Sequence, residues 1–164
     1  MKIVAIVLVL IFFLYSLVKT TETTKVLLSV TTSTFKDADT EGRVFFTINM
    51  DKKKRYVLDI PQHKDRFLGA KDSYEFTIEY PMDKITDVTL SIESSDAWKM
   101  KEFVVQFISD GKYSIKYLAN NPKWLSNEDH DIKKMNAKPE YTYKIDMKYF
   151  DYKNVPTIYL NSEK

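Results

Sequence analysis

The sequence of 164 residues contains no cysteine. This absence excludes disulfide bonds, a thiol nucleophile and thiolate metal ligands. Glycine is also scarce, with three residues in the chain, and this argues against a glycine-rich phosphate-binding loop. No Gly-x-Ser-x-Gly or His-Glu-x-x-His motif occurs, and the two histidines, His63 and His130, lie in no recognisable catalytic motif. We therefore expect a protein that is not an enzyme.

The sequence also lacks a clear excess of one charge. It has 25 Lys+Arg and 23 Asp+Glu, and residues 1–20 contain Lys2 and Lys19 but no acid, so the remainder has 25 − 2 = 23 basic and 23 acidic residues. A nucleic-acid-binding domain usually has a basic excess, so no nucleic-acid partner is expected. The basic run at residues 52–55 would suit anionic lipid headgroups, but a solvated hairpin tip is its simpler interpretation.

The N-terminus begins with a basic residue and an apolar run. Residues 3–18 are apolar apart from Tyr15 and Ser16, and this run is shorter than the roughly 20 residues of a membrane-spanning helix. Residues 1–20 are therefore predicted to be a secretory signal peptide, and the protein is predicted to be secreted. Because the small-residue cleavage signal is weak, an uncleaved anchor at the membrane is the alternative. Residues 21–164 show no linker or repeat and are expected to form one monomeric domain.

Short alternating segments dominate the rest of the chain. In residues 73–80 aromatic or aliphatic side chains alternate with polar ones, which is the period of a half-buried strand. Asp110-Gly111 is a hairpin-turn signal. The expected strands are residues 26–32, 43–50, 55–60, 73–80, 85–93, 102–108, 112–118, 141–149 and 157–160. This spacing predicts an all-β fold, an antiparallel β-sandwich of about eight strands, with an irregular stretch at residues 120–140 that has room for a helical turn near residues 128–135.

Several markers, in this order and spacing, resemble the PLAT (lipoxygenase-homology) domain. They are Asp39-Thr40-Glu41-Gly42 before Val44-Phe45-Phe46-Thr47-Ile48, then Phe67, Gly69, Asp72 and Tyr74-Glu75-Phe76, then Ile92-Glu93 before Trp98-Lys99-Met100-Lys101-Glu102-Phe103-Val104-Val105, and last Trp124-Leu125. The resemblance covers about residues 26–125. Asp39 stands where the family usually has glycine, and Phe103 where it usually has valine. The resemblance implies a sandwich with Trp98 and Trp124 in its core and a role in binding a lipid surface or a protein partner.

Acidic residues gather in three predicted loops of this arrangement. They are Asp37, Asp39 and Glu41 in the first loop, Asp72 in the second, and Glu93 and Asp96 in the third. The resemblance implies that these loops meet at one rim of the sandwich. Converging carboxylates can supply the oxygen ligands that calcium prefers, so calcium is the candidate cofactor and these six residues are its candidate ligands. The alternative is that they are solvated acids that bind nothing.

Apolar residues beside the acidic loops are candidates for membrane contact. Phe35 precedes the first acidic loop, and Phe67 and Leu68 precede Asp72. The more ordinary role of Phe67 and Leu68 is to seal the end of the core. The sequence thus predicts a secreted, non-catalytic module for a lipid or membrane surface or a protein partner, with calcium as its candidate cofactor. The alternative is a structural or protein-interaction domain, effector- or toxin-like, that binds neither lipid nor metal.

Overall fold

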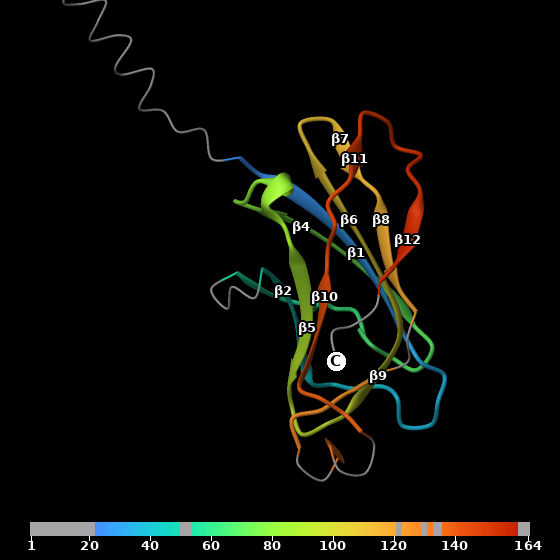
Figure 1. Cartoon of the computed structure of the whole chain (residues 1–164). Helices are drawn as coiled ribbons and strands as arrows, with labels where there is room; N and C mark the ends of the chain where they lie inside the picture. Colours follow the sequence, from blue (N-terminus) through green and yellow to red (C-terminus); the bar gives the residue numbers. More distant parts are fainter. Residues whose placement is uncertain (1–21, 50–53, 121–122, 129–130, 133–135, 161–164) are drawn as a thin grey trace, which may run out of the picture.

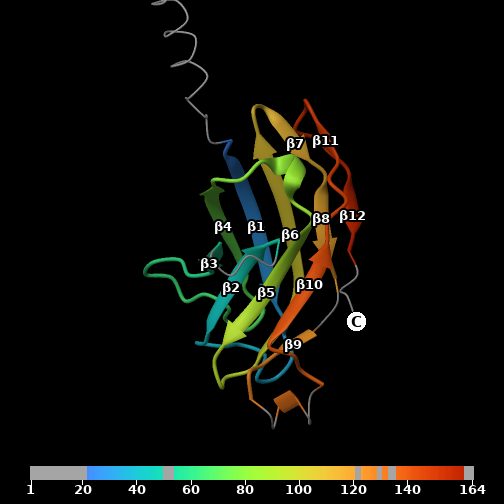
Figure 2. The ribbon, with the colours of Figure 1, turned by 60° about the vertical axis from the view of Figure 1, so that its left-hand side comes forward.

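The computed structural model describes residues 22–49, 54–120, 123–128, 131–132 and 136–160. The chain forms two β-sheets that lie as two layers (Figure 1, Figure 2). The elements are β1 (Thr24–Thr32), β2 (Arg43–Ile48), β3 (Arg55–Val57), β4 (Lys71–Ile78), a 3-10 turn η1 (Met82–Lys84), β5 (Asp87–Glu93), β6 (Trp98–Ser109), β7 (Lys112–Ser114), β8 (Lys116–Ala119), β9 (Lys123–Leu125), β10 (Glu140–Lys144), β11 (Tyr149–Phe150) and β12 (Thr157–Tyr159). The predicted all-β sandwich is confirmed.

The larger sheet has eight strands, with the order β11-β7-β6-β1-β4 along its main path. Strands β8 and β9 also pair with β6, and β12 pairs with β8. The pairing of β12 with β8 is parallel, whereas the other strand pairings of this sheet are antiparallel. The smaller sheet has the order β10-β5-β2-β3 and is antiparallel throughout.

The core lies between the two sheets and follows the period-two pattern of the sequence. Every second residue of β1 is buried, including Val26, Leu28 and Val30. The smaller sheet contributes side chains such as Phe46 and Leu90. Trp98 is fully buried, as predicted, and its indole Nε1 donates a hydrogen bond to Thr32 Oγ1 at 3.0 Å. This bond satisfies the one polar atom of the indole inside the core.

Two predicted strands are interrupted in the structure. The expected strand at residues 112–118 divides into β7 and β8 at Ile115. Ser114 explains the break, because its buried Oγ accepts a hydrogen bond from Phe107 N and donates one to Ile115 O, and such side-chain bonds compete with the sheet ladder. The expected strand at residues 141–149 ends at Lys144 with β10, and Tyr149 belongs to β11 in the larger sheet.

Several expectations fall on residues outside the described part of the chain. These are the N-terminal segment, the first lysines of the basic run, and His130. The helical turn expected near residues 128–135 is described only in part, where Ile132 N donates to Glu128 O at 3.0 Å. Among the described residues, no helix is long and apolar enough to span a membrane.

Two buried tyrosines differ in how their hydroxyls are satisfied. Tyr117 Oη donates to Asp146 O at 2.8 Å and accepts from Lys148 N at 3.1 Å. Tyr143 Oη is buried and has no hydrogen-bond partner among the described residues. Burial raises the pKa of Tyr117 to about 12 and raises the pKa of Tyr143 above its usual range. Both hydroxyls therefore stay neutral in the folded protein at pH values where an unfolded tyrosine, with a pKa of about 10, ionises.

We predict opposite effects for the two Tyr→Phe substitutions at pH 7. Tyr143→Phe removes an unpaired buried hydroxyl and leaves the free energy of unfolding unchanged or raised by up to about 1 kcal/mol, whereas Tyr117→Phe lowers it by about 1 kcal/mol because Lys148 N loses its acceptor.

The raised pKa values mean that stability present below pH 10 is lost as the pH rises from about 10 to 12, and Tyr143→Phe should reduce this loss. Urea unfolding at pH 7 and pH 10.5 measures both effects. A larger loss at pH 7 for Tyr143→Phe than for Tyr117→Phe would contradict the assignment.

Candidate functional site

The loop after β1 and the loop before β4 lie side by side. Thr32 N donates to Ala70 O at 2.9 Å, and Gly69 N donates to Ser33 O at 3.3 Å. Ser33 N in turn donates to Lys99 O at 2.9 Å, next to the start of β6. Figure 1 shows the loop after β1 at the end of the sandwich opposite β7 and β11. Main-chain hydrogen bonds thus hold these segments together at one end of the fold.

Four of the six predicted acidic ligands lie around one pocket at this end. The pocket has a volume of about 240 Å³, and its acidic lining includes Asp37, Asp39, Glu41 and Asp96. Asp96 ties two of the loops together, because its Oδ2 accepts hydrogen bonds from Thr40 Oγ1 at 2.8 Å and from Glu41 N at 3.0 Å. The first and third acidic loops therefore meet. Asp65 lines the same pocket, and Lys64 and Arg66 in its lining offset part of the negative charge.

The structure places Glu93 away from these four acids. Glu93 contacts the guanidinium of Arg55 and lines a different pocket, of about 280 Å³, on the smaller sheet. Arg55 pairs with Thr47 across β2 and β3, and Glu93 pairs with Arg43 at the end of β5. The ion pair thus lies on a sheet face and not between loops.

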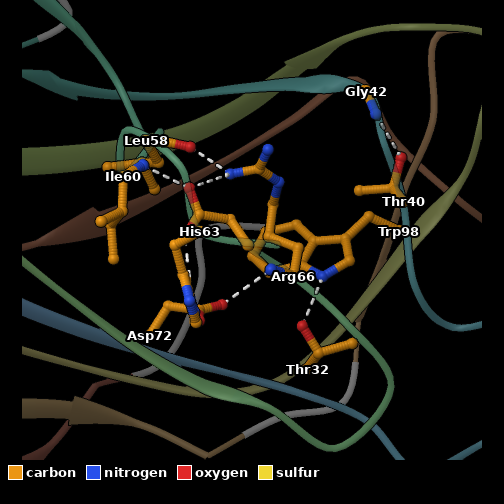
Figure 3. Close-up of polar contacts among 10 residues, drawn as sticks. Thr32, Thr40, Gly42, Leu58, Ile60, His63, Arg66, Asp72 and Trp98 are labelled. Atoms are coloured by element: carbon orange, nitrogen blue, oxygen red, sulfur yellow. Dashed lines mark hydrogen bonds and ion pairs between the residues drawn. The ribbon is translucent and has the colours of Figure 1, made fainter.

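Asp72 does not line the acidic pocket, and it belongs to β4 and not to a loop. In β4 the buried positions alternate, and Asp72 shares the inward side with Tyr74. Its Oδ2 accepts a hydrogen bond from Arg66 N at 2.7 Å, and its Oδ1 lies 3.2 Å from His63 Nε2 (Figure 3). The strand begins at Lys71, two residues earlier than predicted. The alternation seen in residues 73–80, extended backwards by one step, would have placed Asp72 inside.

A buried polar network surrounds Asp72. Arg66 is 7% exposed, and its Nη1 donates to Leu58 O (Figure 3). Asp65 is equally buried, and its Oδ2 accepts from Ile60 N and lies 3.7 Å from Arg66 Nη1. Burial raises the pKa of Asp65, and the Ile60 N–H and the Arg66 charge partly oppose that rise.

Neither Asp65 nor Arg66 was predicted as a functional residue. The available signal is the spacing His63-Lys64-Asp65 followed by an inward-facing Asp72. Read together, these positions predict three ligand-type side chains close in space. Because the expected strand begins at Ser73, the sequence-based prediction leaves Asp72 in a loop.

Exposed apolar side chains flank the acidic pocket. Phe35 is 57% exposed, Phe67 49% and Leu68 39%. The expectation that Phe67 and Leu68 seal the end of the core is therefore wrong. Phe35 packs edge-on against Trp124, with ring centroids 6.1 Å apart. Trp124, which was expected in the core, is only half-buried.

Two lysines accompany these exposed rings. Lys99 Nζ lies 3.9 Å from the centroid of the Phe35 ring, and Lys64 Nζ lies 5.1 Å from that of Phe67. Both distances are within the range of cation–π attraction. The end of the sandwich therefore presents apolar side chains and cations together, beside a pocket rich in carboxylates.

The junction of the first and third loops depends on Gly42. A Cβ at this position would lie 2.4 Å from Ser94 Cβ, and Gly42 N donates to Thr40 Oγ1 at 2.9 Å (Figure 3). We predict that Gly42→Ala lowers the free energy of unfolding by about 1–3 kcal/mol, because the added methyl group displaces the third loop.

Gly111→Ala is the matched control in urea unfolding. Gly111 has a φ of +74°, and a Cβ there would have no neighbour within 4 Å, so this variant has backbone strain of about 1 kcal/mol but no clash. If Gly42→Ala costs no more than Gly111→Ala, the close approach of the two loops is refuted.

Comparisons with known proteins identify no family for this chain. No protein-family model matches the sequence, and no curated protein matches it. Among solved structures, coral 8R-lipoxygenase, described with calcium activation via a C2-like domain, is 19% identical over 62% of this chain and 15% of its own, with a TM-score of 0.46. Alpha-toxin from Clostridium absonum is 19% identical over 70% of this chain and 33% of its own, with a TM-score of 0.48.

A third similar structure is alpha-toxin from an avian strain of Clostridium perfringens. It is 19% identical over 64% of this chain and 30% of its own length, with a TM-score of 0.49. The chain thus corresponds to between 15% and 33% of the length of these three proteins. Because all three TM-scores are below 0.5 and the identities are 19%, the PLAT resemblance stays a prediction from the sequence.

Proposed function

We propose that this chain is a secreted, non-catalytic module that binds lipid surfaces with the end of the sandwich that carries Phe35, Phe67 and Leu68. The observation that supports this proposal most directly is the exposure of all three side chains, between 39% and 57%, on two adjoining loops. Exposed apolar side chains gathered at one place are typical of interaction sites. Aromatic rings are also favoured at the boundary between lipid and water.

The lysines beside the rings suit the same orientation. With the apolar side chains in the interface, Lys64 and Lys99 lie at the level of the lipid phosphates. Each lysine near an anionic surface contributes roughly 1 kcal/mol. The carboxylates of the neighbouring pocket oppose this attraction, so the apolar contact supplies the essential part of the binding free energy.

Calcium binding at this end of the sandwich would involve other residues than the lipid contact does. The carboxylates of Asp37, Asp39, Glu41 and Asp96 are the kind of donor that calcium prefers. Within the described part of the chain, however, the group of three acids or histidines close enough to share a metal ion is His63, Asp65 and Asp72. Their ligand atoms all lie within 4.8 Å of one another. The rim carboxylates therefore do not form a preassembled site. Calcium binding stays a prediction from the sequence, and the lipid contact does not depend on it.

The lipid proposal is tested by co-sedimentation with vesicles of phosphatidylcholine and phosphatidylserine. Residues 21–164 are used, because the apolar N-terminal run would itself bind lipid. The protein should pellet with the vesicles. Phe67→Asp combined with Leu68→Asp should lower the affinity at least about tenfold, since withdrawing one such side chain from the interface costs on the order of 1.4 kcal/mol or more.

Tyr159→Asp is the matched control, because Tyr159 is 74% exposed on β12, outside the two loops. Its binding should equal that of the unaltered protein. The proposal fails if the unaltered protein does not pellet with any vesicle, and binding to a protein partner then becomes the leading function. Equal losses in the control and the double variant would also refute this orientation.

The calcium prediction is tested on the same protein by thermal unfolding. Calcium that binds the folded state must raise the melting temperature. If the rim carboxylates bind it, Asp39→Asn abolishes the rise and Glu93→Gln preserves it, because Glu93 contacts Arg55 on the sheet face. A melting temperature that is the same in calcium and in EDTA would refute the prediction.

A further inference from the structure

Three potential metal ligands converge at the base of the loop between β3 and β4. His63 Nε2 lies 3.2 Å from Asp72 Oδ1 and 3.9 Å from Asp65 Oδ1. All three ligand atoms lie within 4.8 Å of one another. Figure 3 shows the His63 side chain directed toward that of Asp72. We propose that His63, Asp65 and Asp72 form a site for a divalent transition-metal ion, for which zinc is the reference.

The spacing of the three atoms suits one small ion between them. Two ligand atoms that each lie about 2.0–2.2 Å from zinc at the tetrahedral angle are roughly 3.3–3.6 Å apart. The two nitrogen–oxygen separations, 3.2 Å and 3.9 Å, lie on either side of this range. Small side-chain shifts are therefore enough to bring the three atoms to bonding distance.

An unpaired carboxylate oxygen provides an independent indication of a ligand. The Asp65 side chain is 2% exposed, and its Oδ1 has no hydrogen-bond partner among the described residues. This oxygen is the one that faces His63 Nε2. A buried, unpaired carboxylate oxygen is costly, and a cation bound there would remove the cost.

The other oxygen of each carboxylate is held by a main-chain donor. Asp65 Oδ2 accepts from Ile60 N, and Asp72 Oδ2 accepts from Arg66 N. A main-chain N–H thus holds the Oδ2 atom of each carboxylate, and both Oδ1 atoms face the imidazole. Hydrogen bonds of this kind commonly orient the ligands of metal sites.

The donor set selects among metal ions. Calcium and magnesium prefer sites made of oxygen alone, whereas imidazole nitrogen favours zinc and neighbouring transition metals. Three protein ligands leave a fourth position for water. His63 has a side chain 53% exposed, so an ion can reach the site from solvent although both carboxylates are buried.

The local charge also leaves room for a divalent cation. Two carboxylates carry a charge of −2, and the buried Arg66 guanidinium, 3.7 Å from Asp65 Oδ2, offsets part of it. The site does not rest on the proposed lipid binding, and either proposal can fail without the other.

The test is a zinc titration of the full chain, purified in a non-ionic detergent and stripped with EDTA. Calorimetry should show one zinc ion bound per chain. His63→Ala should weaken binding by more than about 100-fold, because loss of an outer-shell partner alone typically costs 10- to 100-fold. Since His63 is exposed, this variant keeps the fold, which circular dichroism verifies. Asp65→Asn should show a similar loss, and calcium in excess should not displace the zinc.

His130→Ala is the matched control, because the sequence contains two histidines. It should bind zinc with the affinity of the unaltered chain. The proposal is overturned if the chain binds no zinc, if His63→Ala retains the affinity, or if His130→Ala loses it. In the first case the contacts of His63 with Asp65 and Asp72 are structural only.

Discussion

Strand β1 lies between β4 and β6, and its register with both strands decides where the loops at one end of the sandwich meet. Val30 pairs with Asp72 on one side and with Phe103 on the other. Because side chains alternate between the faces of a sheet, a slip of one residue would turn Asp72 out of the interior. The burial of Tyr74 and Ile78 in the same strand excludes that slip, since it would expose them as well. The hydrophobic core thus fixes the position of a carboxylate that has no part in the core.

A buried carboxylate in turn constrains the loop that precedes it. Asp72 needs donors, and the chain supplies Arg66 N and the His63 ring. Asp65 likewise takes Ile60 N. The backbone adopts positive φ angles at Gln62 and Arg66, of 65° and 57°, which cost roughly 1–2 kcal/mol at each non-glycine residue. The charge-assisted hydrogen bonds to these carboxylates are strong enough to offset that cost.

The sequence predicted the parts of this fold that depend on alternation. The sandwich and its principal strands follow from side chains such as Tyr74 and Ile78, whose burial repeats every second residue. The division between β7 and β8 did not follow, because it depends on hydrogen bonds of Ser114 to Phe107. Such contacts join residues through a turn and leave no periodic trace in the sequence.

The candidate site was predicted less completely, for a related reason. The resemblance to the PLAT domain implied that the loops of Asp37 and Asp96 meet, and the structure places both residues at one pocket. The composition of a loop does not reveal which acids will find donors inside the fold. Asp72, in strand β4, accepts a hydrogen bond from Arg66 N, and Glu93 contacts Arg55 on a sheet face. Neither partner follows from the composition of a loop, so only the three-dimensional structure separates Asp72 and Glu93 from the other four acids.

The exposure of Phe67 and Leu68 follows from the same network. Apolar side chains normally turn inward unless the backbone that carries them is held otherwise. Here the main chain on the N-terminal side is held at Arg66 by Asp72, and on the C-terminal side at Gly69 by Ser33. Phe67 and Leu68 lie between these two points, and their side chains are 49% and 39% exposed. The proposed lipid contact of Phe67 and Leu68 and the proposed metal site thus both depend on the buried carboxylate of Asp72. An ion bound at that site would also make the loop that carries Phe67 and Leu68 more rigid.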